Sequence, residues 1–309
     1  MDRYNDLNSY LKKRYGVKVY KICIDGGFTC PNRDGTVGFG GCTFCSERGA
    51  GENINESYSI EEQAIMACDR SKKKHKAKKF IAYFQNFTGT YGEIEQLRFK
   101  YEQSIINKDI VALSIATRPD CINLNIVNLL CEIRSKYNID IWIELGLQTT
   151  NDVVAEKFNR GYKTKVFYNA VELLTQNEID VVIHILFGLP GENKISMINT
   201  IKDVANLKIK GIKFHCLYVV KNTILENLLV DGKYKTLEED EYIELLVKSI
   251  SLISPEVVVH RLVSDCRKEL LVEPLWINDK NRIRNKILET LSSKNIYQGD
   301  KYEAPVKTI

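Results

Sequence analysis

The amino-acid sequence predicts an α/β fold, namely a partial TIM barrel of six βα units, (βα)6, followed by a small C-terminal α/β extension. Three observations support this prediction. Helical patterns alternate with strand patterns over residues 18–222. The strand segments are nearly continuous β-branched apolar runs, which is typical of parallel sheets buried on both faces. Polar clusters follow the strand segments, at the carboxyl ends where such sheets bind ligands.

The elements follow in a regular order. An amphipathic helix is expected at 6–16, ended by Gly16, before a first strand at 19–25. The next five helix and strand pairs are 59–71 with 78–85, 94–106 with 109–117, 124–137 with 139–149, 164–177 with 179–189, and 195–208 with 212–220. The pattern then weakens to a helix at 236–253, a strand at 256–265 and a helix near 280–293. We therefore expect a helical segment at 1–17, a core at 18–222 and an extension at 223–309 packed on the core.

Composition excludes some classes of protein. The chain has 309 residues and a net charge of +4, which is compatible with nucleic acid binding but not diagnostic of it. The opening MDRYNDLNSYLKKRYG lacks the apolar core of a signal peptide, so we expect a cytoplasmic protein with reduced thiols. No run approaches the eighteen or so apolar residues of a membrane helix, so no membrane partner is expected.

The most informative stretch is CPNRDGTVGFGGCTFC, which contains Cys30, Cys42 and Cys45 in a C-x11-C-x2-C spacing. A structural zinc site uses four closed ligands. An iron–sulfur cluster held by three cysteines leaves one iron open for a second molecule. Cys23 would be a fourth zinc ligand, but it lies in the strand pattern VYKICID, and no second C-x-x-C is present. An open cluster is the main hypothesis and a zinc site the alternative.

Polar residues after the other strands are expected to meet this loop on one rim. They are Gln85, Asn86, Thr88 and Thr90; Thr117, Arg118 and Asp120; Glu144 and Gln148; the GLPGE stretch from Gly188; and Lys221, Asn222 and Thr223. Each also has a structural interpretation, such as a turn or a helix cap. Glu144 stands out because it interrupts an apolar strand, where an unpaired carboxylate is costly. His184 and His215 lie within predicted strands, where each is either a buried core residue or a contact for the substrate. The basic run 71–79 is read as a solvated helix end on the opposite rim.

Several motifs together resemble one known family. They are GFTCPNRDGTVGFGGCTFC, YFQNFTGTY, SIATRPDC, IELGLQT, NRGY, HILFGLPGE, HRLVSD and EPLW. The cysteine loop resembles the cluster motif of the radical S-adenosylmethionine (SAM) enzymes. Its long first gap departs from the commonest C-x-x-x-C-x-x-C form and resembles the YhcC/YtqA-type family, which is related to the catalytic subunit of Elongator. The resemblance runs from about residue 15 to residue 299.

The resemblance implies a set of site residues. Cys30, Cys42 and Cys45 would ligate a [4Fe-4S] cluster whose fourth iron binds SAM, and reduction would cleave SAM to a 5′-deoxyadenosyl radical. Related enzymes often hold the methionine part through a Gly-Gly-Glu, where this chain has QNFTGTY with Gln85 and Thr88. Glu144, Gln148 and Arg160 match positions that would bind the ribose or the methionine carboxylate, and Gly188 sits where the fifth strand passes the adenine.

The resemblance suggests a substrate and partners as well. It points to the C5 side chain of a tRNA wobble uridine, for example from carboxymethylaminomethyl- to aminomethyl-uridine, with a flavodoxin- or ferredoxin-type electron donor. Arg118, Lys163, Lys221 and Arg261 are candidates for phosphate or carboxylate contacts, and His184 and His215 are the catalytic candidates. Three alternatives stay open: a small-molecule or protein substrate, a sulfur-transferring relative, for which no second cysteine triad exists, and a non-catalytic zinc or RNA-binding module.

Overall fold

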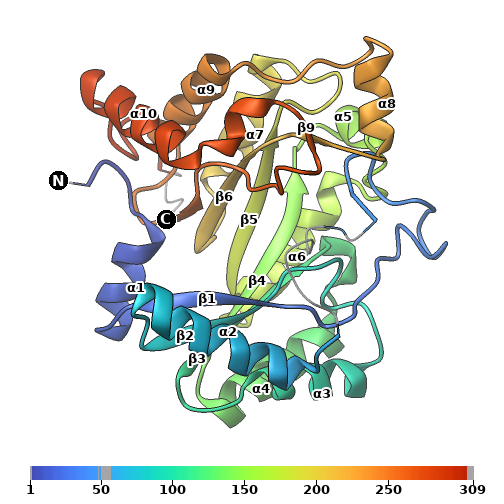
Figure 1. Cartoon of the computed structure of the whole chain (residues 1–309), viewed down its shortest axis with the longest axis vertical. Coiled ribbons are helices and arrows are strands. Elements are labelled where there is room, and N and C mark those ends of the chain that lie inside the picture. The colour runs from blue at the N-terminus through green and yellow to red at the C-terminus, as the bar shows by residue number, and fades with distance from the viewer. Residues whose placement is uncertain (1, 48, 50–56, 305–309) are drawn as a thin grey trace, which may run out of the picture.

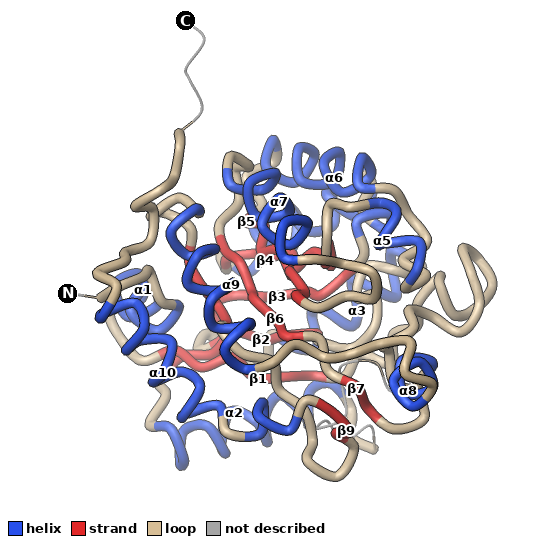
Figure 2. Tube along the Cα trace, turned by 90° about the horizontal axis from the view of Figure 1, so that it is seen from above, coloured by secondary structure: helices blue, strands red, loops and turns tan. Residues whose placement is uncertain are grey.

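The computed structural model describes residues 2–47, 49 and 57–304. Its centre is a parallel seven-stranded sheet in the order β1-β2-β3-β4-β5-β6-β8 (Figure 1). The strands are β1 (Val19–Ile24), β2 (Lys79–Phe84), β3 (Ile110–Thr117), β4 (Asp140–Gln148), β5 (Asp180–Phe187), β6 (Gly211–Cys216) and β8 (Val258–Arg261). The sheet curls into a half-barrel with helices outside it (Figure 2). This architecture confirms the predicted partial TIM barrel.

The helices begin and end where local chemistry favours it. They are α1 (Leu7–Tyr15), α2 (Ile60–His75), α3 (Ile94–Ser104), α4 (Leu124–Tyr137), α5 (Asp152–Lys157), α6 (Thr164–Gln176), α7 (Lys194–Ala205), α8 (Ile224–Val230), α9 (Glu239–Leu252) and α10 (Lys280–Ser293). Ser59 and Glu62 form a capping box that begins α2. Gly16, at φ 72°, ends α1 in the left-handed conformation that favours glycine.

Strand β4 shows how the sheet separates an outer core from an inner one. Ile141 and Ile143 pack in the main core between the sheet and the helices. Trp142 points the other way, into a smaller cluster inside the barrel that includes Leu11 and Val19. Because side chains alternate along a strand, Glu144 also faces the interior, one layer above Trp142. The lower interior is therefore apolar, and a polar layer begins at Glu144.

The half-barrel has an open seam. Among the described residues, the edge strands β1 and β8 each pair with only one neighbour in this sheet. Helix α1 contacts both edges, and Val259 donates its backbone N–H to the carbonyl of Asn5 at 2.8 Å. Helix α1 thus fills the lower part of the seam, beside the apolar layer, while the upper part carries no strand.

The structure corrects the prediction in two places. The strand expected at 256–265 was assigned to the C-terminal extension, but it forms β8 of the main sheet, where Arg261 is the register partner of Lys213. The strand expected at 212–220 divides into β6 and β7 (Val219–Val220), and β7 pairs antiparallel with β9 (Leu271–Glu273). Both errors arise where the chain leaves the regular βα alternation. Among the described residues, none of the helices has the length and apolar content needed to cross a bilayer.

Candidate active site

The cysteine loop follows β1 and is fastened to the loop after α5. The Asn32 side chain donates to the carbonyl of Asn159 at 2.6 Å, and the Asn159 side chain donates to the carbonyl of Gly41 at 2.9 Å. Backbone turns close each end, with Arg33 N–H donating to Cys30 and Cys45 N–H to Cys42. This reciprocal asparagine pair holds the loop in place. The pair has no local signal in the sequence, because the two residues are 127 positions apart.

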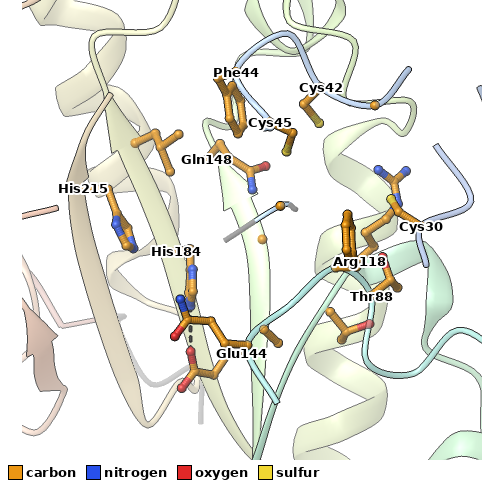
Figure 3. A pocket seen from close by; sticks show the side chains of 18 of the residues that line it. Cys30, Cys42, Phe44, Cys45, Thr88, Arg118, Glu144, Gln148, His184 and His215 are labelled. Atoms are coloured by element: carbon orange, nitrogen blue, oxygen red, sulfur yellow. Dashed lines mark hydrogen bonds and ion pairs between the residues drawn. The ribbon is translucent and has the colours of Figure 1, made fainter. Parts of the chain in front are cut away.

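All three cysteines line one cavity of about 280 Å³. Figure 3 shows Cys42 and Cys45 close together beside Phe44, with Cys30 across the cavity near Arg118. The three thiols are free of disulfides. A hydrogen bond between Cys42 and Cys45 lowers the pKa of the Cys45 thiol, and the positive charge of Arg33 lowers it as well. The same hydrogen bond, together with burial, raises the pKa of the Cys42 thiol. The site therefore favours thiolate at Cys45.

The predicted zinc alternative lacks its fourth ligand. Cys23 does not line the cavity of the other three cysteines, and its thiol donates to the Gln85 side chain at 3.2 Å. Within the described ranges, no group of three or more His, Cys, Asp or Glu side chains is arranged to hold a single metal ion. A cubane cluster differs, since its cysteines bind separate irons and need not converge on one point.

Gln148 is aimed into the cavity by its backbone. The pairing of β4 with β5 shifts register between Gly146 and Gln148, and Gln148 adopts a φ of +65°. A non-glycine residue in the left-handed region at a bulge is uncommon and often marks a functional position. Figure 3 shows the Gln148 side chain pointing into the cavity near Cys45. Thr88 lines the same cavity, and its buried hydroxyl makes no hydrogen bond to the described part of the chain.

Arg160 is a correction to the predicted site. Its guanidinium donates to the carbonyls of Tyr162, Leu147 and Thr149, to Asp152 and to the Thr164 hydroxyl. An arginine has five N–H donors, so these partners use all of them. Arg160 is 1% exposed and organises the loop after β4. The geometry therefore leaves it no donor for a cofactor, against the prediction.

Arg118 remains beside the cysteines. It forms a bidentate ion pair with Asp120, at 2.9 and 2.7 Å, and donates to the carbonyl of Arg160 at 2.9 Å. Burial alone would lower the pKa of Arg118, but Asp120 and the thiols of Cys30 and Cys42 raise it. Arg118 therefore supplies a fixed positive charge facing the three cysteines.

Glu144 lies at the centre of a buried ionic layer in the barrel. Its Oε1 accepts from Lys21 at 2.5 Å and from Ser114 at 2.7 Å, while its Oε2 accepts from Lys213 and, at 2.9 Å, from His184. Burial alone would raise the pKa of Glu144, but Lys21, Lys213 and His184 outweigh it and hold that pKa well below its usual range. Both carboxylate oxygens are thus occupied by protein donors.

The two catalytic candidates lie side by side next to this layer, with their rings tilted by 33°. The rings of His184 and His215 have centroids 5.2 Å apart, and both line the cavity. His184 donates to Glu144 (Figure 3), whereas the buried Nε2 of His215 makes no hydrogen bond to the described residues. Burial, together with the charge of Lys213, lowers the pKa of His184 to about 4. Both histidines are therefore neutral at neutral pH.

This burial gives the protein a pH-dependent stability. The pKa of His184 is about 4 in the folded chain and 6.5 for an ordinary histidine, so the unfolded chain binds more protons between these values. The free energy of unfolding should fall as the pH drops from 6.5 to 4, with His184 contributing on the order of 2–3 kcal/mol. Denaturant unfolding at several pH values should show a shallower fall for His184→Gln. Equal slopes for the two proteins would contradict the assignment.

Three predicted residues lie away from the cavity. Lys163 is exposed and pairs with Glu156, and Lys221 donates to the backbone carbonyl of Glu269 at 2.8 Å. Gly188 does not line the cavity: its carbonyl accepts from Tyr234, and a Cβ there would lie 3.0 Å from Leu237. The other predicted positions all line the cavity, namely Gln85, Thr88, Arg118, Glu144, Gln148, Arg160, His184, His215, Arg261 and the three cysteines.

A groove of about 730 Å³ adjoins the cavity and shares Tyr83, Gln85, Lys213 and Arg261 with it. One wall is a face of α2, and the others are the edge strand β1 and the segment from β8 towards β9. Among the residues that the structure describes, six Lys or Arg side chains line the groove, namely Lys21, Arg70, Lys74, Lys213, Arg261 and Arg267, against one carboxylate, that of Asp265. The basic run 71–79, expected on the opposite rim, in fact begins in this groove with Ser71, Lys74 and His75.

Comparisons with known proteins agree with this geometry. The profile of the Radical SAM superfamily matches residues 30–204, and that of the Radical_SAM C-terminal domain matches residues 209–293. YtqA of Bacillus subtilis is 40% identical over 96% of this chain and 92% of its own length, and YhcC of Escherichia coli is 36% identical over 87% and 86%. The tRNA uridine(34) acetyltransferase of Methanocaldococcus jannaschii is 26% identical over 58% of this chain and 33% of its own.

A solved structure shares the fold. Elp3 of Methanocaldococcus infernus superposes with a TM-score of 0.67 at 18% sequence identity, covering 91% of this chain. This chain spans 64% of the length of that structure. The similarity extends beyond the six predicted βα units, because it covers nearly all of the chain.

Proposed function

Because this chain belongs to the radical SAM superfamily, within the group of YtqA and YhcC, we propose that it is a tRNA-modifying enzyme that acts on the C5 side chain of the wobble uridine. The superfamily binds a [4Fe-4S] cluster and SAM. The proposed reaction class takes carboxymethylaminomethyl- to aminomethyl-uridine. The observation that supports a nucleic acid substrate is the continuity of the cysteine-lined cavity with a strongly basic groove.

The residues present fit the cluster and SAM. Three free thiols face one cavity, and the buried Thr88 hydroxyl in the same cavity has no partner among the described residues. Cys30, Cys42 and Cys45 would hold the cluster, and Gln85, Thr88 and Gln148, which line the same cavity, would contact SAM. When bound, the reduced cluster supplies the electron that cleaves SAM into methionine and a 5′-deoxyadenosyl radical.

The protein's own residues position and shield this chemistry. Phe44, Leu186 and Leu217 line the cavity with apolar surface that excludes water. Arg118 offsets the negative charge of thiolates. His215 lines the cavity and its buried Nε2 has no partner among the described residues, so this side chain would hydrogen-bond a substrate. A flavodoxin- or ferredoxin-type protein would deliver the electron.

The groove carries features of a single-stranded RNA site. Arg70 and Lys74, one helical turn apart on α2, are exposed and form no ion pair or hydrogen bond with the described residues. Tyr20, stacked on His75 at 4.2 Å, and Tyr58, 41% exposed, add aromatic surface on which bases stack. The distant relative from Methanocaldococcus jannaschii is named a tRNA uridine(34) acetyltransferase, and this name supports the wobble uridine of tRNA as the nucleotide that is modified.

Neutralising the groove should weaken RNA binding in a salt-dependent way. Arg70→Gln with Lys74→Gln removes two phosphate contacts, so the slope of log affinity against log salt should become shallower by about 1–2. Fluorescence anisotropy with an anticodon stem-loop would measure this slope. The matched control is Lys73→Gln with Lys78→Gln, which removes two exposed charges outside the groove. An equal change in both double variants would show that the groove is not the RNA site.

The function itself is tested by nucleoside analysis. Mass spectrometry of tRNA from a strain lacking the gene should show accumulation of carboxymethylaminomethyl-uridine and loss of its aminomethyl derivatives. Complementation with the wild-type gene should restore them, and complementation with Cys42→Ala should not. An unchanged wobble-uridine profile would refute the tRNA substrate, and would direct attention to a small-molecule or protein substrate.

A further inference from the structure

The floor of the cavity carries more positive than negative charge. His184, Lys213 and Arg261 are register partners across β5, β6 and β8, so a neutral imidazole and two cationic side chains form a row on adjacent strands. All three line the cavity. Two like charges held close together on neighbouring strands repel each other, which destabilises the folded chain. Lys213 and Arg261 are such a pair, which requires an explanation.

The protein's own carboxylates do not balance Arg261. Both oxygens of Glu144 are occupied by Lys21, Ser114, Lys213 and His184. Asp265, which also lines the cavity, pairs with Lys280. Arg261 is half-buried and makes no hydrogen bond or ion pair with the described residues. A guanidinium held there is therefore free to bind an anion.

A second group points to the same ligand. The Nε2 atom of His215, two residues after Lys213 on β6, is buried in the cavity without a partner among the described residues. Such an atom costs free energy unless a ligand or water satisfies it. Arg261 also lies where the cavity meets the groove, because it lines both. A group carried in along the groove would reach Arg261 before the cysteines.

We propose that Arg261, with Lys213 and His215, binds a carboxylate of the substrate. A guanidinium matches a carboxylate through two parallel hydrogen bonds, and Lys213 adds a second cation from the neighbouring strand. The identity of this carboxylate rests on the proposed function: it is the carboxylate of the carboxymethyl group on the wobble uridine. The site would then distinguish the substrate from the aminomethyl product, which has no carboxylate.

The first test uses no RNA. The melting temperature of the full chain is measured in sodium acetate and in sodium chloride at equal ionic strength. Acetate should raise the melting temperature of wild type by about 2 °C more than it raises that of Arg261→Gln. Comparison with the variant removes the general effect of acetate on protein stability. In chloride, Arg261→Gln should melt no lower than wild type, because it removes a like-charge contact. Lys221→Gln, outside the cavity, should behave as wild type. An acetate effect equal in all three proteins would overturn the carboxylate site.

The second test identifies the carrier of the carboxylate. The affinity of the protein is measured for two anticodon stem-loops of the same sequence. The first carries carboxymethylaminomethyl-uridine and the second carries aminomethyl-uridine. Wild type should prefer the first, and Arg261→Gln should lose about tenfold or more of that preference, with part regained by Arg261→Lys. Equal weakening for both RNAs would place Arg261 on a phosphate and overturn the proposal. If the reconstituted variant binds SAM more weakly but keeps its preference between the two RNAs, Arg261 binds the carboxylate of SAM, and the proposal is overturned.

The two tests separate the inference from the function on which it rests. If wild type prefers neither RNA but acetate still stabilises it through Arg261, the carboxylate site stands and the assigned tRNA substrate is wrong. If acetate has no specific effect, the site is wrong whatever the RNAs show.

Discussion

Replacing Cys42 with alanine is expected to abolish both the cluster and SAM cleavage. Cys42 faces the same cavity as Cys30 and Cys45, and a cluster with two protein thiolates is not retained. After anaerobic reconstitution, iron should fall from about four per chain to below about one. Release of 5′-deoxyadenosine on reduction should fall below detection.

The matched control for this prediction is Cys68→Ala. Cys68 is 3% exposed and packs in the outer core from α2, and it does not line the cavity. Its loss should leave iron content and SAM cleavage unchanged, with at most a small loss of stability. Full activity in Cys42→Ala would refute the ligand assignment, as would tightly bound zinc in the wild-type chain without SAM cleavage.

Glu144→Gln is expected to be the most destabilising conservative change in the barrel. The substitution keeps the size of the side chain but removes the negative charge between Lys21 and Lys213. Removing one partner of a buried ion pair costs about 3 kcal/mol or more. The melting temperature should therefore fall by about 6 °C or more, measured by differential scanning calorimetry.

A chemically identical change at the surface provides the comparison. Glu132 pairs with Arg98 at 2.6 Å, but its side chain is 59% exposed. Glu132→Gln should alter stability by no more than about 0.5 kcal/mol. Similar effects of the two substitutions would mean that the ionic layer is solvated and does not hold the barrel together.

The half-barrel, and the meeting of most candidate residues at one cavity, could be predicted because both follow from local patterns. Parallel strands place their carboxyl ends on one rim, so residues such as Thr88, Arg118 and Gln148 were brought to the cysteines as expected. Helix α4 has the bounds expected from its pattern, 124–137, and in the structure Asn123 caps its start and Asn138 ends it in the left-handed conformation. These signals lie within a few positions of one another.

The errors have a different origin. Arg160 was read as a ligand contact because the sequence does not show that its five donors are used by its own loop. Lys221 follows β7, which has left the main sheet, so the rule for strand ends no longer applied to it. The ionic layer around Glu144 was also missed, although Lys21 and Lys213 had an available signal, since each is a charged residue inside an apolar strand.

The seam between β1 and β8 has a mechanical consequence. No backbone hydrogen bond of the main sheet crosses it among the described residues, and α1 joins the two edges only near the amino-terminal ends of the strands. Separating the upper edges would therefore break side-chain contacts but no ladder of the sheet. An opening of the seam at this end would therefore require no unfolding of the sheet.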